Sequence, residues 1–191
     1  MMKEIISKIL AAHEKACQNV AKNNIGDIEK ITKAIINCYR QGGKVIFFGN
    51  GGSAADAQHL ATELVCRLKL ERKALPAMAL NTNNSLLTAQ GNDYGFETIF
   101  SRQIEAFAAK NDVIIGISTS GNSENVMKAI VLANKLGCTT IGFSGGDGGM
   151  LAKTAELNLV VSSNITQHVQ EMHITVGHII CELVEEAIAR Q

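Results

Sequence analysis

The stretch KVIFFGNGGSAADAQHLATEL, residues 44–64, decides the fold of this chain. It begins with the uninterrupted apolar run 45–48, which is typical of a parallel strand covered on both faces. Three glycines then allow a tight turn and a close approach of the backbone to a ligand. Ser53 is a good N-cap for the helix that follows, and the exposed N–H groups at that helix start favour an anion. His59 and Glu63 stand four residues apart on one face of the helix, a spacing that suits a divalent ion.

Two other interpretations of this stretch stay open. Residues 49–54 also match the dinucleotide-binding motif G-x-G-x-x-A, but the next predicted strand ends at Asn81 and not at the acidic residue that would bind a ribose. On spacing alone, His59 and Glu63 are better explained as an ordinary hydrogen-bonded pair on a helix. Other parts of the chain therefore have to decide between a metal site and a structural pair.

Composition favours a single compact domain. The chain has 191 residues, 46% of them hydrophobic, and one proline, which suits a domain that buries a sizeable core. Lys plus Arg and Asp plus Glu both number 18, and no basic cluster forms a stripe for nucleic acid or an anionic membrane. We therefore expect no nucleic acid and no membrane as partners, and any bound phosphate to be small. Zero net charge gives little repulsion between copies, which is consistent with an oligomer.

The cysteines point to a reducing compartment. There are five, widely spaced and without a C-x-x-C pair, so we expect buried free thiols. The first ten residues carry charges at Lys3, Glu4 and Lys8, unlike the apolar region of a signal peptide. No apolar run approaches the roughly 18 residues that a membrane-spanning helix needs. The expected location is the cytoplasm.

Two amphipathic helices with broad apolar stripes are predicted in residues 1–41. We expect this N-terminal helical hairpin to pack against another subunit as well as against its own core. His13 lies on the first stripe, where a structural histidine is the favoured interpretation. The first stripe comprises Ile6, Ile9, Leu10, His13, Cys17 and Val20, and the second comprises Ile28, Ile31, Ile35, Cys38 and Tyr39.

Strands alternate with helices over residues 44–191. We predict a doubly wound five-stranded parallel sheet of flavodoxin-like type, with ligands at the carboxyl ends of its strands. A helical run from Ser85 is expected to break at Gly91, with Asn92 and Asp93 at the break. We interpret the chain as one domain, with the hairpin at 1–41 and an α/β core at 44–191. The predicted strands are 45–48, 77–80, 112–116, 139–143 and 157–161, and a final helix runs from about 166 to 190.

The loop STSGNS, residues 118–123, follows the third predicted strand and precedes a helix. Ser118, Thr119, Ser120 and Ser123 offer four neutral donors beside a helix N-terminus, which together bind a phosphate without the lysine of a P-loop. The alternative is a serine-rich helix cap, but a cap uses one or two hydroxyls. We therefore predict a phosphate site here and no ATP site.

Four motifs spread over nearly the whole chain carry a family resemblance: GNGGSAADAQHLATEL, GNDYGFETIFSRQ, GISTSGNS and VQEMHITVGH. They resemble the sugar isomerase (SIS) fold and, within it, the bacterial phosphoheptose isomerase family. The resemblance implies conversion of a phosphorylated seven-carbon sugar, sedoheptulose 7-phosphate, to a manno-heptose 7-phosphate for bacterial surface lipopolysaccharide or capsule. It also implies a homotetramer and a cofactor, one zinc ion (Zn²⁺) per subunit.

The resemblance also implies a role for each residue that matches a family motif. Two departures, Asn83 and Gln167, stand on the sugar-binding rim, where the family often has an aspartate at the first and an aspartate or threonine at the second. The implied phosphate ligands are Ser118, Thr119, Ser120 and Ser123. The other implied substrate contacts are Asn50, Gly51, Gly52, Ser53, Glu63, Asn92, Asp93 and Gln170. The implied zinc ligands are His59, Glu63, Gln170 and His178.

The chemistry of such an isomerisation suggests two catalytic residues. Ketose to aldose conversion needs a base that moves a proton between C1 and C2 and a group that stabilises the enediol oxygen. Glu63 is the candidate for the C1/C2 proton shuttle, and His178 for proton transfer at the oxygens or for ring opening, with a metal polarising the carbonyl. Because a residue bound to the ion is a poor base, the ligand and base roles of these two residues compete.

Helix geometry bears on the assembly. Gln170 and His178 are eight residues apart, about 12 Å along a straight helix and roughly 80° around it, at the limit of reach for one ion. Either the helix is broken between them, or the two residues come from different chains. We favour sites at the subunit interfaces of a homotetramer. The rival function is a non-catalytic SIS module that binds a replication initiator protein, and the presence of both Glu63 and His178 disfavours it.

Overall fold

The computed structural model describes residues 1–190. Over these residues, five parallel strands form one sheet in the order β2-β1-β3-β4-β5, so the predicted doubly wound sheet is confirmed. The strand order changes direction between β1 and β3, with Phe47 opposite Ala79 of β2 on one side and Ile115 of β3 on the other. The strands are β1 Val45–Gly49, β2 Ala77–Ala79, β3 Val113–Ile117, β4 Thr139–Gly145 and β5 Leu157–Val161.

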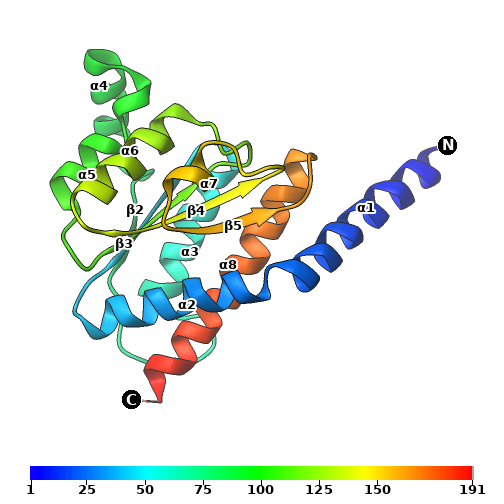
Figure 1. Ribbon diagram of the computed structural model, residues 1–191, viewed down its shortest axis with the longest axis horizontal. Helices are drawn as coiled ribbons and strands as arrows, with labels where there is room; N and C mark the ends of the chain where they lie inside the picture. The colour runs from blue at the N-terminus through cyan, green and yellow to red at the C-terminus, as the bar shows by residue number, and fades with distance from the viewer. Residues whose placement is uncertain (191) are drawn as a thin grey trace.

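Helices cover both faces of the sheet (Figure 1). Helices α2, α3 and α8 pack on one face, and α5, α6 and α7 pack on the other. In the described part of the chain, every helix falls short of the length or apolarity needed to cross a membrane. The helices are α1 Met2–Asn23, α2 Ile25–Arg40, α3 Gly52–Val65, α4 Asn84–Tyr94, α5 Ser101–Phe107, α6 Glu124–Lys135, α7 Leu151–Thr154 and α8 Thr166–Ala189, with a 3₁₀ turn η1 at Phe96–Thr98.

The central strand β1 explains why the sequence stretch 44–64 organises the fold. Its successive side chains point to opposite faces, so Val45 and Phe47 pack with α2, α3 and α8, whereas Ile46 and Phe48 join the core under α5 and α6. Every residue of this strand is buried. Phe48 also packs against Phe100, with ring centroids 5.1 Å apart. The unbroken apolar run therefore reflects a strand with a core on each side.

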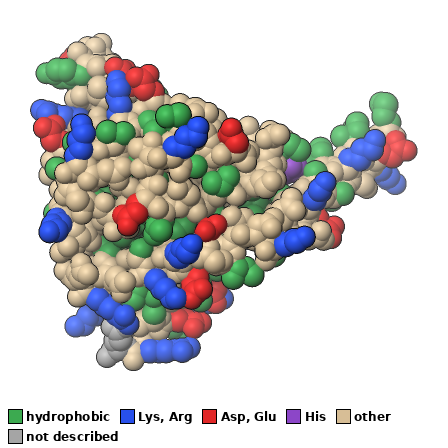
Figure 2. Space-filling model, viewed as in Figure 1, with side chains coloured by type: hydrophobic (Ala, Val, Ile, Leu, Met, Phe, Trp, Pro, Cys, Tyr) green, Lys and Arg blue, Asp and Glu red, His purple; other side chains and the backbone are tan. Residues whose placement is uncertain are grey.

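The N-terminal helices form the predicted hairpin, and it is wide open. Asn24 alone joins α1 to α2, and α1 projects from the body of the molecule (Figure 1). Val20 of the first predicted stripe is buried, but the N-terminal part of that stripe lies outside the core of its own chain. Figure 2 shows hydrophobic side chains on the surface of the projecting helix. Three residues of the predicted stripe there are at least half exposed: Ile6, Ile9 and Leu10.

Two predicted helix boundaries were wrong, and glycine explains both. Helix α4 continues through Gly91, since one glycine costs a helix interior only about 1 kcal/mol. It ends at Tyr94, and Gly95 at the C-cap position has a φ of +97°. Helix α3 begins at Gly52, with Gly51 at the N-cap position. Gly51 has a φ of +55°, in the left-handed region that favours glycine. Ser53 therefore lies buried within the first turn and does not cap the helix.

The cysteines are free thiols, as predicted, but not all are buried. Burial raises the pKa of the Cys38 thiol to about 11 and of the Cys181 thiol to about 12. The expectation that every thiol is buried was wrong, because one exposed cysteine lines an open apolar groove beside α1 and the other lies at the C-cap of α3. The exposed thiols are those of Cys17 and Cys66.

Candidate active site

The loops that follow β1 and β3 meet where the strand order changes direction. Asn50, after β1, and Asn125, in the first turn of α6, exchange two amide hydrogen bonds of 2.9 Å each. This pair fixes the glycine loop 49–52 beside the serine loop 118–123. In open α/β sheets, ligands bind in the crevice outside the carboxyl ends of the strands at such a point. Both loops that the sequence singled out lie at this edge.

The hydroxyl groups of the serine loop point toward one another. Ser118 Oγ lies 2.9 Å from Ser123 Oγ and 3.5 Å from Ser120 Oγ. Ser123 occupies the N-cap position of α6, yet over the described residues its side chain makes no capping hydrogen bond. The hydroxyls therefore gather beside a helix N-terminus without being used to cap it. This arrangement favours an anion site over the serine-cap alternative.

A neighbouring loop holds the serine loop in place. Gly121 has a φ of +67° and passes so close to the loop after β4 that a Cβ at this position would clash with the backbone of Gly148. The Leu151 N–H also donates a 2.9 Å hydrogen bond to the Gly121 carbonyl. Contacts within the protein therefore support loop 118–123 against loop 145–150 and the start of α7.

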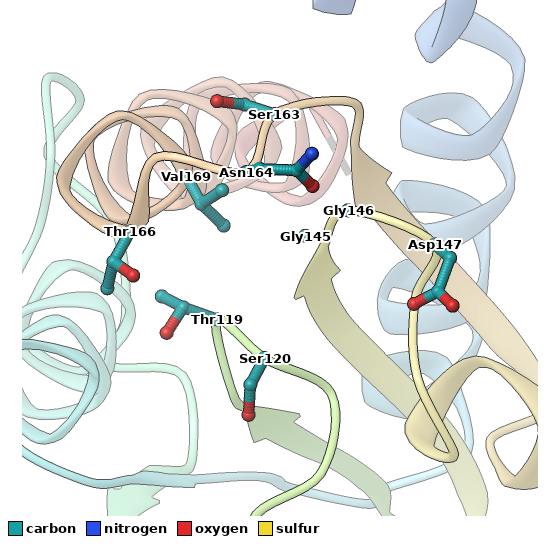
Figure 3. A pocket seen from close by; sticks show the side chains of 9 residues that line it. All are labelled: Thr119, Ser120, Gly145, Gly146, Asp147, Ser163, Asn164, Thr166 and Val169. Atoms are coloured by element: carbon teal, nitrogen blue, oxygen red, sulfur yellow. The ribbon is translucent and has the colours of Figure 1, made fainter.

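A cavity of about 500 Å³ opens beside the serine loop (Figure 3). Thr119 and Ser120 contribute to it from the loop after β3. The end of β4, the loops after β4 and β5, and the start of α8 complete it. These later segments were not predicted from the sequence as part of the site, although every loop that follows a parallel strand lies at the same edge of the sheet. The missed lining residues are Gly145, Gly146, Asp147, Ser163, Asn164, Thr166 and Val169.

Helices α3 and α8 run side by side in the same direction, since Gln170 pairs with Asp56 near the start of both and His178 pairs with His59 further along. Gly177 allows this close approach, because a Cβ there would overlap a leucine of α3. The two helices thereby present their polar residues to each other along one seam. The start of this seam adjoins the cavity, because Thr166 and Val169 of α8 line it.

His59, Glu63 and His178 form a cluster in this seam. The Nε2 atoms of the two histidines are 2.8 Å apart, and His59 Nε2 is 3.1 Å from Glu63 Oε1. One potential ligand atom from each residue lies within 4.8 Å of the others. Two imidazole nitrogens and a carboxylate oxygen are donors that zinc accepts, so the residues present fit such an ion. The Glu63 side chain is only 16% exposed.

Gln170, the fourth residue of the predicted ligand set, is paired elsewhere in the single chain. Its Nε2 atom donates to both carboxylate oxygens of Asp56, at 2.7 and 2.9 Å. Helix α8 is continuous from Thr166 to Ala189, so the alternative of a broken helix was wrong. Burial raises the pKa of the Asp56 carboxyl, while the bond from Gln170 opposes that shift. Sequence reasoning missed Asp56, although its position three residues before His59 places both on one face of α3.

A buried ion pair holds the end of α3 that carries Glu63. Arg72 Nη2 donates to the Glu63 carbonyl at 2.8 Å, and Arg72 Nε lies 3.2 Å from Glu185 Oε1. The two charged side chains are 3% and 1% exposed. This pair fixes the loop after α3 and, through the carbonyl, the backbone of Glu63. The Glu185 carboxylate also accepts the backbone N–H groups of Leu68, Lys69 and Leu70.

Two predicted substrate contacts lie on the exposed helix α4, which projects at one corner of the molecule (Figure 1). There Asn92 Nδ2 donates to Asp93 Oδ1 at 2.8 Å, and both side chains face solvent. Asn83, the departure from the family pattern, caps this helix by accepting a 3.0 Å bond from the Leu86 N–H. Gly52 lies at the seam, where a Cβ would contact the Gln170 side chain.

Over nearly its whole length, the chain is similar to proteins of one family. A family model described as SIS domain matches residues 10–145. A phosphoheptose isomerase of Geobacter sp. (strain M21) is 52% identical over 187 residues, which are 98% of this chain and 97% of that protein. Solved structures of phosphoheptose isomerases from Francisella tularensis and Neisseria gonorrhoeae match with TM-scores of 0.94 and 0.92, at 33% and 36% identity. Both cover 97% of this chain, with 99% and 100% of their own chains.

Proposed function

We propose that this chain, which belongs to the phosphoheptose isomerase family of SIS domain proteins, converts D-sedoheptulose 7-phosphate to D-glycero-D-manno-heptose 7-phosphate through an enediol. The observation that carries the proposal is the α3–α8 seam, which begins beside the cavity next to the serine loop and leads to the cluster around Glu63. From Gln170, at the start of the seam, His178 is about 12 Å further along α8. A sugar with its phosphate at C7 and its carbonyl at C1 or C2 requires two such separated sites.

In this proposal the serine loop binds the phosphate and Glu63 acts on the carbon chain. Glu63 moves a proton between C1 and C2, and His178 moves a proton at the sugar oxygens or opens the ring. The partial burial of the Glu63 carboxylate keeps water from competing with the substrate. Asn50, Gly51, Gly52 and Ser53 lie at the loop and helix start beside the phosphate, and Gln170 lies next to the cavity.

The proposed cofactor is one zinc ion per subunit, held by His59, Glu63 and His178, with Gln170 as a fourth ligand once it leaves Asp56. When bound, such an ion polarises the substrate carbonyl and stabilises negative charge on its oxygen. The hydrogen bonds of Gln170 to Asp56 support its inclusion, because they place the amide in the same seam between α3 and α8 as the cluster.

The proposed assembly is a homotetramer with its sites at subunit interfaces. An apolar groove of about 640 Å³ lies between α1, α2 and α8, and the exposed stripe of α1 continues beside it. Apolar surface of this kind marks a site of association. Asn92 and Asp93 on the projecting helix α4 are then available to the sugar of a neighbouring subunit.

We place the reaction in the cytoplasm, in the synthesis of heptose for bacterial lipopolysaccharide or capsule, and free thiols are consistent with that compartment. The alternative of a non-catalytic module that binds a replication initiator is not supported. Two relatives of this chain, which match 98% and 84% of it, carry the name of an enzyme, and the chain has both Glu63 and His178.

Direct turnover tests the proposal. Purified protein supplied with Zn²⁺ is incubated with sedoheptulose 7-phosphate, and NMR follows the appearance of the aldose signal. We expect manno-heptose 7-phosphate to accumulate, with much slower conversion of sedoheptulose that lacks the phosphate. Glu63→Gln protein is the matched control for a contaminating isomerase. If folded protein with bound zinc yields no aldose, the proposed activity is wrong.

A further inference from the structure

A second cluster of two histidines and one glutamate lies where α1 crosses the start of α8. His13 Nδ1 is 2.7 Å from Glu171 Oε2, and His168 Nδ1 is 2.9 Å from the same oxygen. The three potential ligand atoms lie within 4.8 Å of one another. None of these residues has a part in the isomerisation described above.

The spacing and burial of these three residues suit the binding of a ligand. His168 and Glu171 are three residues apart, so they share one face of α8, and His13 approaches them from α1. The His168 side chain is 3% exposed, whereas Glu171 and His13 are 41% and 44% exposed. The imidazole planes are inclined by 72°, with ring centroids 6.1 Å apart. The cluster therefore has one buried anchor and one side open to solvent.

The hydrogen bonds of this cluster indicate which ligand could replace their protons. A single carboxylate oxygen accepts bonds from two Nδ1 atoms, and this requires a proton on Nδ1 of each ring. A divalent cation can take the place of both protons, because neutral imidazole nitrogen and carboxylate oxygen are its usual donors. With ligand distances of about 2.0–2.2 Å, a tetrahedral ion separates its ligand atoms by roughly 3.3 Å. Small movements of the side chains would reach that separation, since the two histidine nitrogens lie 2.7 and 2.9 Å from the carboxylate oxygen and all three atoms lie within 4.8 Å of one another.

We propose that His13, His168 and Glu171 bind a second divalent first-row cation such as Zn²⁺, which fastens α1 to α8. Three protein ligands leave a fourth position for water or for a group from another molecule. The role of this ion is structural. Helix α1 projects from the body and buries few of its own side chains, so a link through an ion would fix its direction.

The number of bound ions per chain tests this proposal without reference to isomerase activity. The protein is stripped with a chelator and equilibrated with a low excess of Zn²⁺, and bound metal is counted by mass spectrometry. We expect two ions per wild-type chain, one in Glu171→Gln, one in His59→Ala and none in the double variant. Glu14→Gln is the matched control, because it removes the same charge from an exposed neighbour of His13 and should retain both ions.

Hydrogen exchange of α1 gives a second measurement. Added Zn²⁺ should slow amide exchange in α1 of the wild type and of Glu14→Gln, but not of Glu171→Gln. If Glu171→Gln fails to fold by circular dichroism, His13→Ala makes the same test at a half-exposed side chain. Unchanged metal content in these variants would show that the cluster is only a hydrogen-bonded triad, and the proposal would be wrong.

Discussion

The two clusters of histidine and glutamate in this molecule contain the same residue types and share helix α8, but their surroundings differ. The cluster around Glu63 joins α8 to α3, which packs on the sheet, and it lies in the seam that starts at the cavity. The cluster around Glu171 joins α8 to the projecting helix α1. Glu63 is 16% exposed with its backbone held by Arg72, whereas Glu171 is 41% exposed. Of two clusters with the same composition, we therefore assign the proposed catalytic role to the less exposed one, whose backbone Arg72 holds.

The largest difference between the two clusters should appear in kcat when the carboxylates of Glu63 and Glu171 are removed in turn. Glu63→Gln should lower kcat for sedoheptulose 7-phosphate by at least ~100-fold, because the amide keeps the size but accepts no proton. Glu171→Gln should leave kcat within about twofold, and circular dichroism should be unchanged in both variants. If Glu63→Gln retained more than a tenth of the wild-type kcat, the assignment of Glu63 as the base would be wrong.

His173, which lies on α8 between the two clusters, should make the fold sensitive to acid. Its Nε2 atom donates to the Ser144 carbonyl at 3.0 Å, and burial lowers the pKa of its imidazole to about 4 from 6.5. Between these values the unfolded chain binds the proton and the folded chain does not. Stability is therefore fully present above pH 6.5 and falls as the pH drops toward 4, by about 3 kcal/mol in total.

Urea unfolding at pH 7 and at pH 4.5 measures this effect. His173→Gln keeps a donor for Ser144 but has no proton to gain, so its stability should depend less on pH over this range than that of the wild type. An equally steep dependence in both proteins would contradict the assignment to His173.

A smaller effect is expected at the serine loop, where we propose that the phosphate binds. In the proposed binding mode, Ser120→Ala and Ser123→Ala each remove a hydroxyl bond to the charged phosphate, worth about 1.5–3 kcal/mol, so the KM should rise roughly 10- to 150-fold. Calorimetric titration with the phosphorylated sugar separates this binding effect from turnover. Ser101→Ala is the control, because its hydroxyl bonds the Thr98 carbonyl away from the cavity. Unchanged affinity in both loop variants would contradict the phosphate site and favour the alternative of a serine-rich helix cap.

The smallest effect is expected from mixed assemblies. Glu63 and His178 of one chain already lie together, so hybrids of Glu63→Gln and His178→Ala subunits should regain almost no activity. Subunit exchange must first be verified by mass spectrometry of intact assemblies. Substantial recovery would instead mean that these two residues act across a subunit interface.

The sheet was predictable because its central strands β1 and β3 are apolar runs with helices on both sides, and because strands alternate with helices along the chain. Helix limits were harder where glycine decided them, since Gly91 and Gly95 are alike in the sequence and only the second adopts a positive φ. In the candidate site, spacing along α3 suggested His59 with Glu63. The pairing of Gln170 with Asp56 depends on how α3 and α8 pack together, although they are far apart in the sequence. Local spacing of residues cannot predict such a pairing.

The buried pair of Arg72 and Glu185 restricts how this protein can change over evolutionary time. Losing either partner leaves an uncompensated buried charge, at a cost of about 3–5 kcal/mol, which is a large share of a typical folding free energy. Replacing both with apolar residues also leaves three backbone N–H groups without the Glu185 carboxylate that accepts their hydrogen bonds. Removing either charged side chain, or both together, therefore lowers the free energy of unfolding. Descendants of this chain should therefore inherit Arg72 and Glu185 as a unit, even where the surface around them diverges.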